Sequence, residues 1–206
     1  MNYIKLAFNY LYKNWQYMTL PIAAYMLVLL LCNLHSMSWI VFLIWLQVPI
    51  YMIHQFEEHA FPGGFKDFVN RNLFHITRQD VPLDDTNVFW INIPFIGILF
   101  PFGAAFAQLI DPSIGMLVVF FAMFNATLHI LWLIAFRKYN PGVLASIFLN
   151  YPSGIYTLIV AHQLGILTWQ WSLVAFSVAL IGHLCIVVYA VWRYQHIKRE
   201  GKLLIT

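Results

Sequence analysis

Residues 114–136 read IGMLVVFFAMFNATLHILWLIAF and contain no charged side chain. As an α-helix this run extends over ~34 Å, which is enough to cross the ~30 Å hydrocarbon core of a bilayer. Arg137 and Lys138 follow directly, as basic residues do at the end of a membrane span. The segment therefore predicts a transmembrane helix. A membrane β-barrel is excluded because the run lacks the alternation of polar and apolar residues that barrel strands show.

The rest of the chain repeats this pattern. Of its 206 residues, 62% are hydrophobic and 9% are charged, whereas a soluble domain has roughly a quarter of its residues charged. The charged residues form short clusters between apolar runs. The sequence predicts an all-α polytopic membrane protein, a single transmembrane domain over residues 1–206, with six spans at roughly 17–34, 38–56, 88–110, 114–136, 143–166 and 169–192.

The basic residues predict the orientation of these spans. All 11 Lys and Arg residues precede the first span, lie between the second and third spans, or follow the fourth or the sixth. The other three connections contain none. By the positive-inside rule, both termini and a loop or cap at about residues 57–87 face the cytoplasm, which requires an even number of spans. We expect a multi-pass integral membrane protein with cytoplasmic N- and C-termini.

Charge and cysteine content exclude several functional classes. The formal net charge is +3, but the Lys and Arg residues flank apolar segments and form no single basic face, so we expect no nucleic-acid partner. Cys32 and Cys185 both fall within predicted spans, and two such residues cannot build a disulfide framework or a cysteine-rich metal site. Lys5 and Lys13 precede an apolar stretch without a cleavage site, which predicts an uncleaved first span.

The motif His54-Gln55-Phe56-Glu57-Glu58-His59 stands where the second span reaches the membrane surface. On a helix, positions 54, 57 and 58 are i, i+3 and i+4, so we expect the imidazole and both carboxylates to project from one face. That arrangement suits metal chelation or acid–base chemistry. Alternatively, the two glutamates simply end the helix in water. Acids at a helix C-terminus oppose the macrodipole, however, which favours the functional interpretation.

Further polar residues are predicted at a comparable depth in other spans. Asn125 and His129 are i and i+4 on the fourth span, with His129 ~12 Å below the surface. Since polar groups in hydrocarbon need partners, Asn125 and the carboxylates are plausible partners of His129. His183 is ~15 Å deep beside Gly182, a context that favours a packing role. The supporting polar shell is predicted to comprise Asn125, Asn92, Asn150, His183 and His59.

These motifs resemble the HXXEE-domain family of small multi-span membrane proteins. The resemblance rests on residues 54–58, on Pro62-Gly63-Gly64-Phe65, on Asn125-x-x-x-His129 and on Tyr139-Asn140-Pro141-Gly142, and it covers about residues 50–155. It implies a multi-span fold with a site built on the His-x-x-Glu-Glu motif. It implies no particular reaction.

The residues favour an enzyme acting near the cytoplasmic leaflet. We expect His54, His129 and Glu58 to bind one divalent metal, such as zinc, and Glu57 and Glu58 to be catalytic, with the glutamate that is not a ligand acting as general base on a metal-bound water. The location and the apolar walls predict a membrane lipid or lipid-like substrate. A metal-free acid–base catalyst would use the same residues.

Three alternatives use the same chain differently. A transporter or metal-ion carrier would use the cluster as a transit site; Pro49, Pro94, Pro101 and Pro152 could break helices, but no half-to-half symmetry is present. The CAAX-type intramembrane peptidases are similar in having a Glu pair and two later His residues. Pro62 and Asn125 occupy positions where those enzymes have Arg and Phe. A purely structural subunit is the third alternative.

Overall fold

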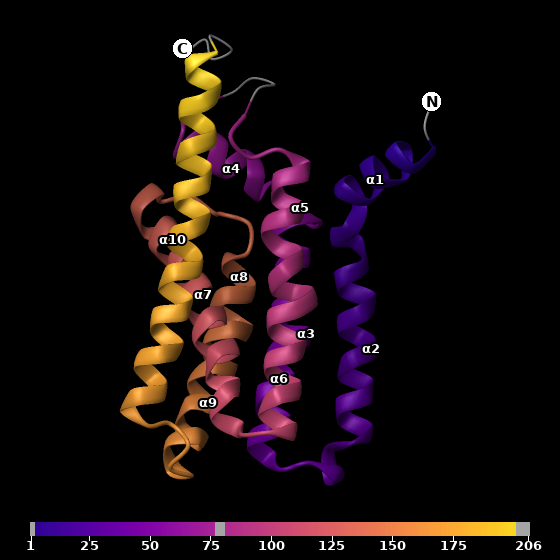
Figure 1. The fold of residues 1–206 in the computed structure, drawn as a ribbon, viewed down its shortest axis with the longest axis vertical. Coiled ribbons are helices and arrows are strands. Elements are labelled where there is room, and N and C mark those ends of the chain that lie inside the picture. The colour runs from indigo at the N-terminus through magenta and orange to yellow at the C-terminus, as the bar shows by residue number, and fades with distance from the viewer. Residues whose placement is uncertain (1–2, 77–80, 201–206) are drawn as a thin grey trace.

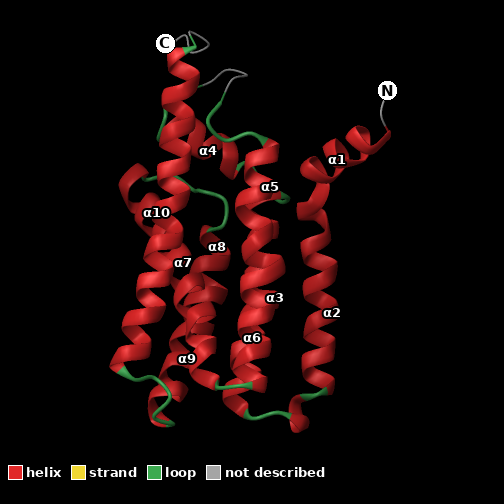
Figure 2. Ribbon diagram, in the orientation of Figure 1, coloured by secondary structure: helices red, strands yellow, loops and turns green. Residues whose placement is uncertain are grey.

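The protein is a bundle of helices that run side by side (Figures 1 and 2). The structure, a computed structural model, describes residues 3–76 and 81–200, and it contains no strand in that part of the chain. Six helical segments are long and apolar enough to cross a membrane, which confirms the six predicted spans. They are Tyr3–Cys32, Trp39–His59, Asp85–Leu109, Pro112–Phe136, Val143–Gln163 and Trp169–Arg199.

The first described helix, α1, and the C-terminal end of α10 lie at the same end of the bundle, as an even number of spans requires (Figure 1). We call this end the terminal end. The short helix α4, Phe65–Asn72, lies across it, within the loop predicted at residues 57–87. The membrane side that this end faces stays a prediction from the positive-inside rule.

The first helical segment starts earlier than the sequence predicted. It comprises α1 (Tyr3–Asn14), a 3₁₀ turn at Trp15–Met18 and α2 (Thr19–Cys32). The helix therefore continues through Lys5 and Lys13, which sequence reasoning had placed before the span. Figure 1 shows α1 turned outward from the bundle at the 3₁₀ turn, and none of its residues is buried.

The most enclosed helix is α3, Trp39–His59, which follows a 3₁₀ turn at Leu34–Ser36. It packs against α2, α6, α7 and α9, and its apolar side chains Ile44, Val48 and Tyr51 are fully buried. Pro49 lies inside α3 without ending it. The His-x-x-Glu-Glu motif occupies the last turns of α3, which places it in the interior at the terminal end.

Two spans contain a π-helical segment. One span consists of α5 (Asp85–Pro94), the π segment Phe95–Leu99 and α6 (Phe100–Leu109). Another consists of α8 (Val143–Ala145), the π segment Ser146–Asn150 and α9 (Tyr151–Gln163). Pro101 and Pro152 follow these segments at the start of α6 and α9. Because proline has no N–H to donate to the preceding turn, the helix changes its hydrogen-bond spacing there and continues.

The remaining spans are α7, Met116–Phe136, preceded by a 3₁₀ turn at Pro112–Gly115, and α10, Trp169–Arg199. Small residues allow α10 to pack closely on α7: a Cβ at Gly182 would lie 3.0 Å from Cε2 of Phe121. At the terminal end, Arg193 of α10 forms an ion pair of 3.0 Å with Asp84, the N-cap of α5. The three helices α5, α7 and α10 therefore surround a common interior.

Candidate metal centre

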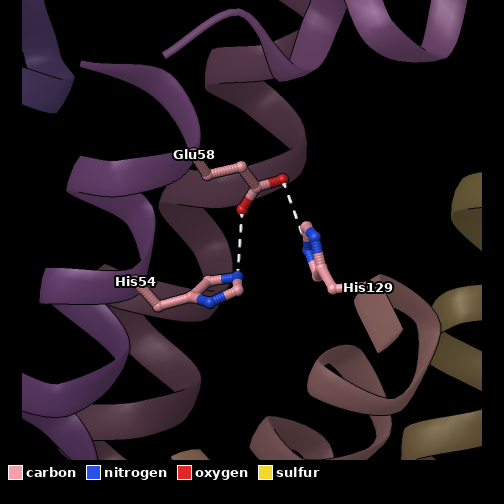
Figure 3. Close-up of side chains that lie close together, drawn as sticks. All are labelled: His54, Glu58 and His129. Carbon is pink, nitrogen blue, oxygen red and sulfur yellow. Dashed lines mark ion pairs between the residues drawn. The ribbon is translucent and has the colours of Figure 1, made fainter. Parts of the chain in front are cut away.

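His54, Glu58 and His129 meet in the interior of the bundle (Figure 3). Glu58 lies between the two imidazoles: its Oε2 is 3.3 Å from His54 Nε2, and its Oε1 is 4.0 Å from His129 Nε2. One potential ligand atom from each residue lies within 4.8 Å of the other two. The residues are 0%, 3% and 1% exposed. The group is therefore shielded from the surface of the protein.

Two helices supply this group. His54 and Glu58 are i and i+4 on α3, so their side chains project from the same face one turn apart. His129 reaches them from α7, which packs beside α3. The predicted convergence of His54, Glu58 and His129 is present in the structure. The depth predicted for His129 from its position in the fourth span therefore agrees with its place in the structure.

Asn140 fixes the orientation of the His129 ring. The Asn140 amide Nδ2 donates to the His129 backbone carbonyl at 2.9 Å, which leaves its Oδ1 as an acceptor 2.7 Å from His129 Nδ1. The Nδ1–H of His129 therefore donates to Asn140, and the lone pair is on Nε2. Outer partners of this kind commonly orient metal-binding histidines.

Neither Nε2 atom makes a hydrogen bond of good geometry, although His54 Nε2 lies 3.3 Å from Glu58 Oε2. Both are buried, and both are directed toward the Glu58 carboxylate. On the other side of the His54 ring, Nδ1 lies 3.5 Å from Ser146 Oγ, whose own hydrogen is donated to the Gly142 carbonyl at 2.7 Å. Buried nitrogen acceptors without partners are costly, and a cation bound between them would remove that cost.

The backbone of Gly142 closes one side of the group. A Cβ at this position would lie 2.7 Å from Cε1 of His129 and 3.0 Å from Cε1 of His54. Its φ of +98° also belongs to the left-handed region that glycine adopts readily. Sequence reasoning assigned no role to Asn140 or Gly142. Their one signal was the Tyr-Asn-Pro-Gly sequence after the fourth span, which predicts a turn but not its contact with His54 and His129.

Glu57 lies apart from the group. Its Oε1 accepts from the Tyr139 hydroxyl at 2.8 Å and from Leu144 N at 3.1 Å, and its Oε2 accepts from Ala145 N at 2.6 Å. Glu57 thus caps the first turn of the helix that begins with α8. Burial, together with the Glu57 carboxylate, raises the pKa of the Tyr139 phenol. The structure does not bring both carboxylates into one group with His54, because positions i+3 and i+4 diverge by about 100° around the helix.

The predicted supporting residues divide into two sets. His59 and Asn92 join the group: His59 Nε2 is 3.6 Å from Glu58 Oε1 and 3.3 Å from Asn92 Nδ2. Asn125 also lies beside the group, since its side chain interacts with the His54 ring and lines the cavity next to Glu58 and His129. Both polar side-chain atoms of Asn150 are buried without partners. His183 lines the cavity beside Glu58 and His129. Its Nδ1 is 2.7 Å from the Ala179 carbonyl, its ring packs against Phe121 and Phe124, and its Nε2 is buried without a hydrogen-bond partner.

A cavity of about 100 Å³, which we call the inner cavity, adjoins Glu58 and His129. Most of the other side chains that line it are apolar or aromatic. Many of them come from α5, the π segment that follows it, α7 and α10, and these include Ile91, Phe95, Leu128, Trp132, Ile186 and Val187. The three-residue group therefore faces an apolar space within the membrane-spanning part of the bundle.

The chain matches one family model, described as a protein of unknown function with HXXEE motif, over residues 45–157. The match covers more than half of the chain. It includes the residues of the group and Asn140, Gly142 and Ser146 around it. No curated protein and no solved structure matches the chain.

Proposed function

The chain belongs to the HXXEE family, and we propose that it is a metal-dependent hydrolase of lipid-like substrates embedded in the membrane. One observation carries the proposal. His54, Glu58 and His129 are buried with their ligand atoms within 4.8 Å of one another, and both Nε2 atoms lack partners. Three potential ligand atoms this close together fit a single metal ion, which would also supply the partner that both nitrogens lack.

The donor set indicates the class of metal. Two imidazole nitrogens and one carboxylate oxygen are ligands that zinc commonly binds in catalytic sites, where a fourth position stays open to water or substrate. A divalent metal at such a position lowers the pKa of a bound water and polarises a carbonyl oxygen. Glu58, between the imidazoles, would supply the oxygen ligand.

The residues around the group support a lipid-like substrate. The inner cavity beside Glu58 and His129 is lined mainly by apolar side chains and lies among α5, α7 and α10. Apolar walls with a few convergent polar groups are typical of sites for largely apolar ligands. A soluble polar substrate would lose its hydration there without compensation.

The two adjacent glutamates have different roles in this proposal. Glu58 binds the metal. Glu57 holds the start of α8, and thereby the Gly142 turn, through the donors that surround its carboxylate. The sequence-based hypothesis made the second glutamate the general base. We assign Glu57 a positioning role, because its carboxylate accepts from Tyr139, Leu144 and Ala145 and lies outside the group of potential ligand atoms.

Metal loading combined with a lipid assay tests the function. The protein is purified, stripped with a chelator, reloaded with zinc and incubated in vesicles made from a membrane lipid extract. We expect about one zinc per chain by elemental analysis, and mass spectrometry of the extract should show a lipid replaced by products whose masses add up to that lipid plus water. The stripped protein should produce no such change.

The alternatives predict different results in the same experiment. A metal-ion carrier would move zinc into the vesicles while no lipid changed mass. A peptidase of the CAAX type would cleave added peptides instead; it would draw on His183, which lies outside the three-residue group. Either result, or the absence of bound metal, would overturn the proposed hydrolase.

The role of Asn140 can be tested through metal affinity. Asn140→Ala removes the acceptor for His129 Nδ1, so the ring loses its fixed orientation. Zinc affinity should fall by about 10- to 100-fold, the usual effect of losing such a partner. Titration against a competing chelator measures this. Asn72→Ala is the control, because the Asn72 amide donates to the Phe68 carbonyl of its own helix, away from His129. Equal affinity in both variants would contradict the orienting role.

A further inference from the structure

A second pocket, the outer pocket, opens at the terminal end of the bundle. Its volume is about 250 Å³, and it lies among the end of α1 with the following 3₁₀ turn, the N-terminus of α4 and the start of α5. Unlike the inner cavity, it has a largely polar lining. The side chains that matter here are Tyr12, Lys13, Trp15, Lys66, Asp67 and Asp85.

The charges of the outer pocket are of both signs. Lys66 and Asp85 form an ion pair with each other. Lys13 and Asp67 take part in no ion pair within residues 3–76 and 81–200. One cation and one anion are therefore available to a ligand. The rings of Tyr12 and Trp15 line the same pocket, and aromatic faces favour an ammonium group.

The outer pocket adjoins the inner cavity. His59, Phe65 and Val88 line both. The Glu58 carboxylate lies at this boundary, since Glu58 lines the inner cavity and its Oε1 is 3.6 Å from His59 Nε2. The outer pocket, the Glu58 carboxylate and the inner cavity are therefore neighbours.

We propose that the outer pocket binds the zwitterionic headgroup of a phospholipid, with the part of the lipid next to the headgroup directed toward the inner cavity. This inference rests on the proposed function. Lys13 contacts the phosphate and Asp67 the ammonium group, while the bonds that join headgroup and chains lie near Glu58. A free zwitterion would leave the adjoining apolar cavity unfilled, which is why the ligand is a lipid.

Lipid retention measured by native mass spectrometry tests the inference without requiring metal or turnover. The stripped protein is equilibrated with phosphatidylcholine, phosphatidylglycerol and diacylglycerol of identical acyl chains. We expect phosphatidylcholine to be retained about tenfold more than either competitor, the size expected for one or two charge-assisted contacts. Equal retention of the three lipids, or a preference for phosphatidylglycerol, would overturn the inference.

Two variants assign the preference to the pocket. Lys13→Gln should lower the retention of phosphatidylcholine to nearly that of diacylglycerol. Asp67→Asn should make the retention of phosphatidylglycerol equal to that of phosphatidylcholine. Lys5→Gln is the control, since Lys5 is exposed on the same helix and does not line the pocket. A preference that survives either pocket variant unchanged would overturn the inference.

The failure of this inference and that of the proposed function are distinguishable. Glu58→Gln should keep the headgroup preference while losing zinc. A protein that binds zinc and hydrolyses lipids without any headgroup preference would refute the outer pocket alone. A preference for phosphatidylcholine in a protein that binds no zinc would refute the proposed function alone.

Discussion

Glu58→Gln is expected to weaken zinc binding by more than about a hundredfold. Losing an outer partner of a ligand costs about 10- to 100-fold, and losing the ligand itself should cost more. Glu58 is also the member that lies between both imidazoles, at 3.3 Å from His54 Nε2 and 4.0 Å from His129 Nε2. A neutral amide replaces the charge that would balance the cation. Competition with a chromophoric chelator gives the affinity, and thermal unfolding verifies that the variant is folded.

Glu57→Gln is the matched control, because it makes the same chemical change one residue away. The Glu57 carboxylate accepts from one hydroxyl and two backbone N–H groups. A glutamine side chain has only one oxygen that can accept from these three donors. We expect a loss of about 1–3 kcal/mol in the free energy of unfolding, the cost of a buried donor left without a partner. Zinc affinity of the folded fraction should stay within a few-fold of the wild type. Equal loss of zinc in both variants, with both folded, would refute the division of roles.

Gly142→Ala is expected to have the largest effect of any single methyl group on the site. The added Cβ would lie 2.7 Å from His129 Cε1 and 3.0 Å from His54 Cε1, so both rings must move. The left-handed φ of +98° adds strain. Overpacking and such strain each cost about 1–3 kcal/mol, and the displaced rings should also lower zinc affinity at least tenfold. Chemical unfolding and the chelator assay measure the two effects.

Gly165→Ala separates the cost of backbone strain from the cost of steric overlap with the two imidazoles. Gly165 also has a positive φ, +70°, but a Cβ there meets nothing within 4 Å. Its variant should show the strain cost alone, with unchanged zinc affinity. If Gly142→Ala behaves like Gly165→Ala in both measurements, the Gly142 turn does not pack against the two imidazoles as described.

The six spans could be predicted because charge and hydropathy are local properties of the sequence. The beginning of the first helical segment could not, since Lys5 and Lys13 do not prevent helix formation; they only prevent burial, and α1 is indeed unburied. The effect of proline was also context-dependent. Pro49 is accommodated within α3, while Pro101 and Pro152 accompany π segments.

The site was predictable in its helical parts. His54 and Glu58 share a helix face by spacing alone, and the depth of His129 follows from its distance to Arg137. The role of Glu57 could not be predicted from spacing, because its partners Tyr139, Leu144 and Ala145 are distant in sequence. Asn140 and Gly142 reach the site through the path of a loop, which no periodicity encodes.

His54 and Glu58 come from one helix, whereas His129 comes from another, and this division has a consequence for the order of assembly. The first two donors are pre-organised by a single turn of α3, so a cation can engage them without any closure of the chain. Engagement of His129 would then join α3 to α7 as a reversible cross-link between segments far apart in sequence. Metal binding would stabilise the packing of α3 against α7, so the free energy of unfolding would rise with the concentration of free metal.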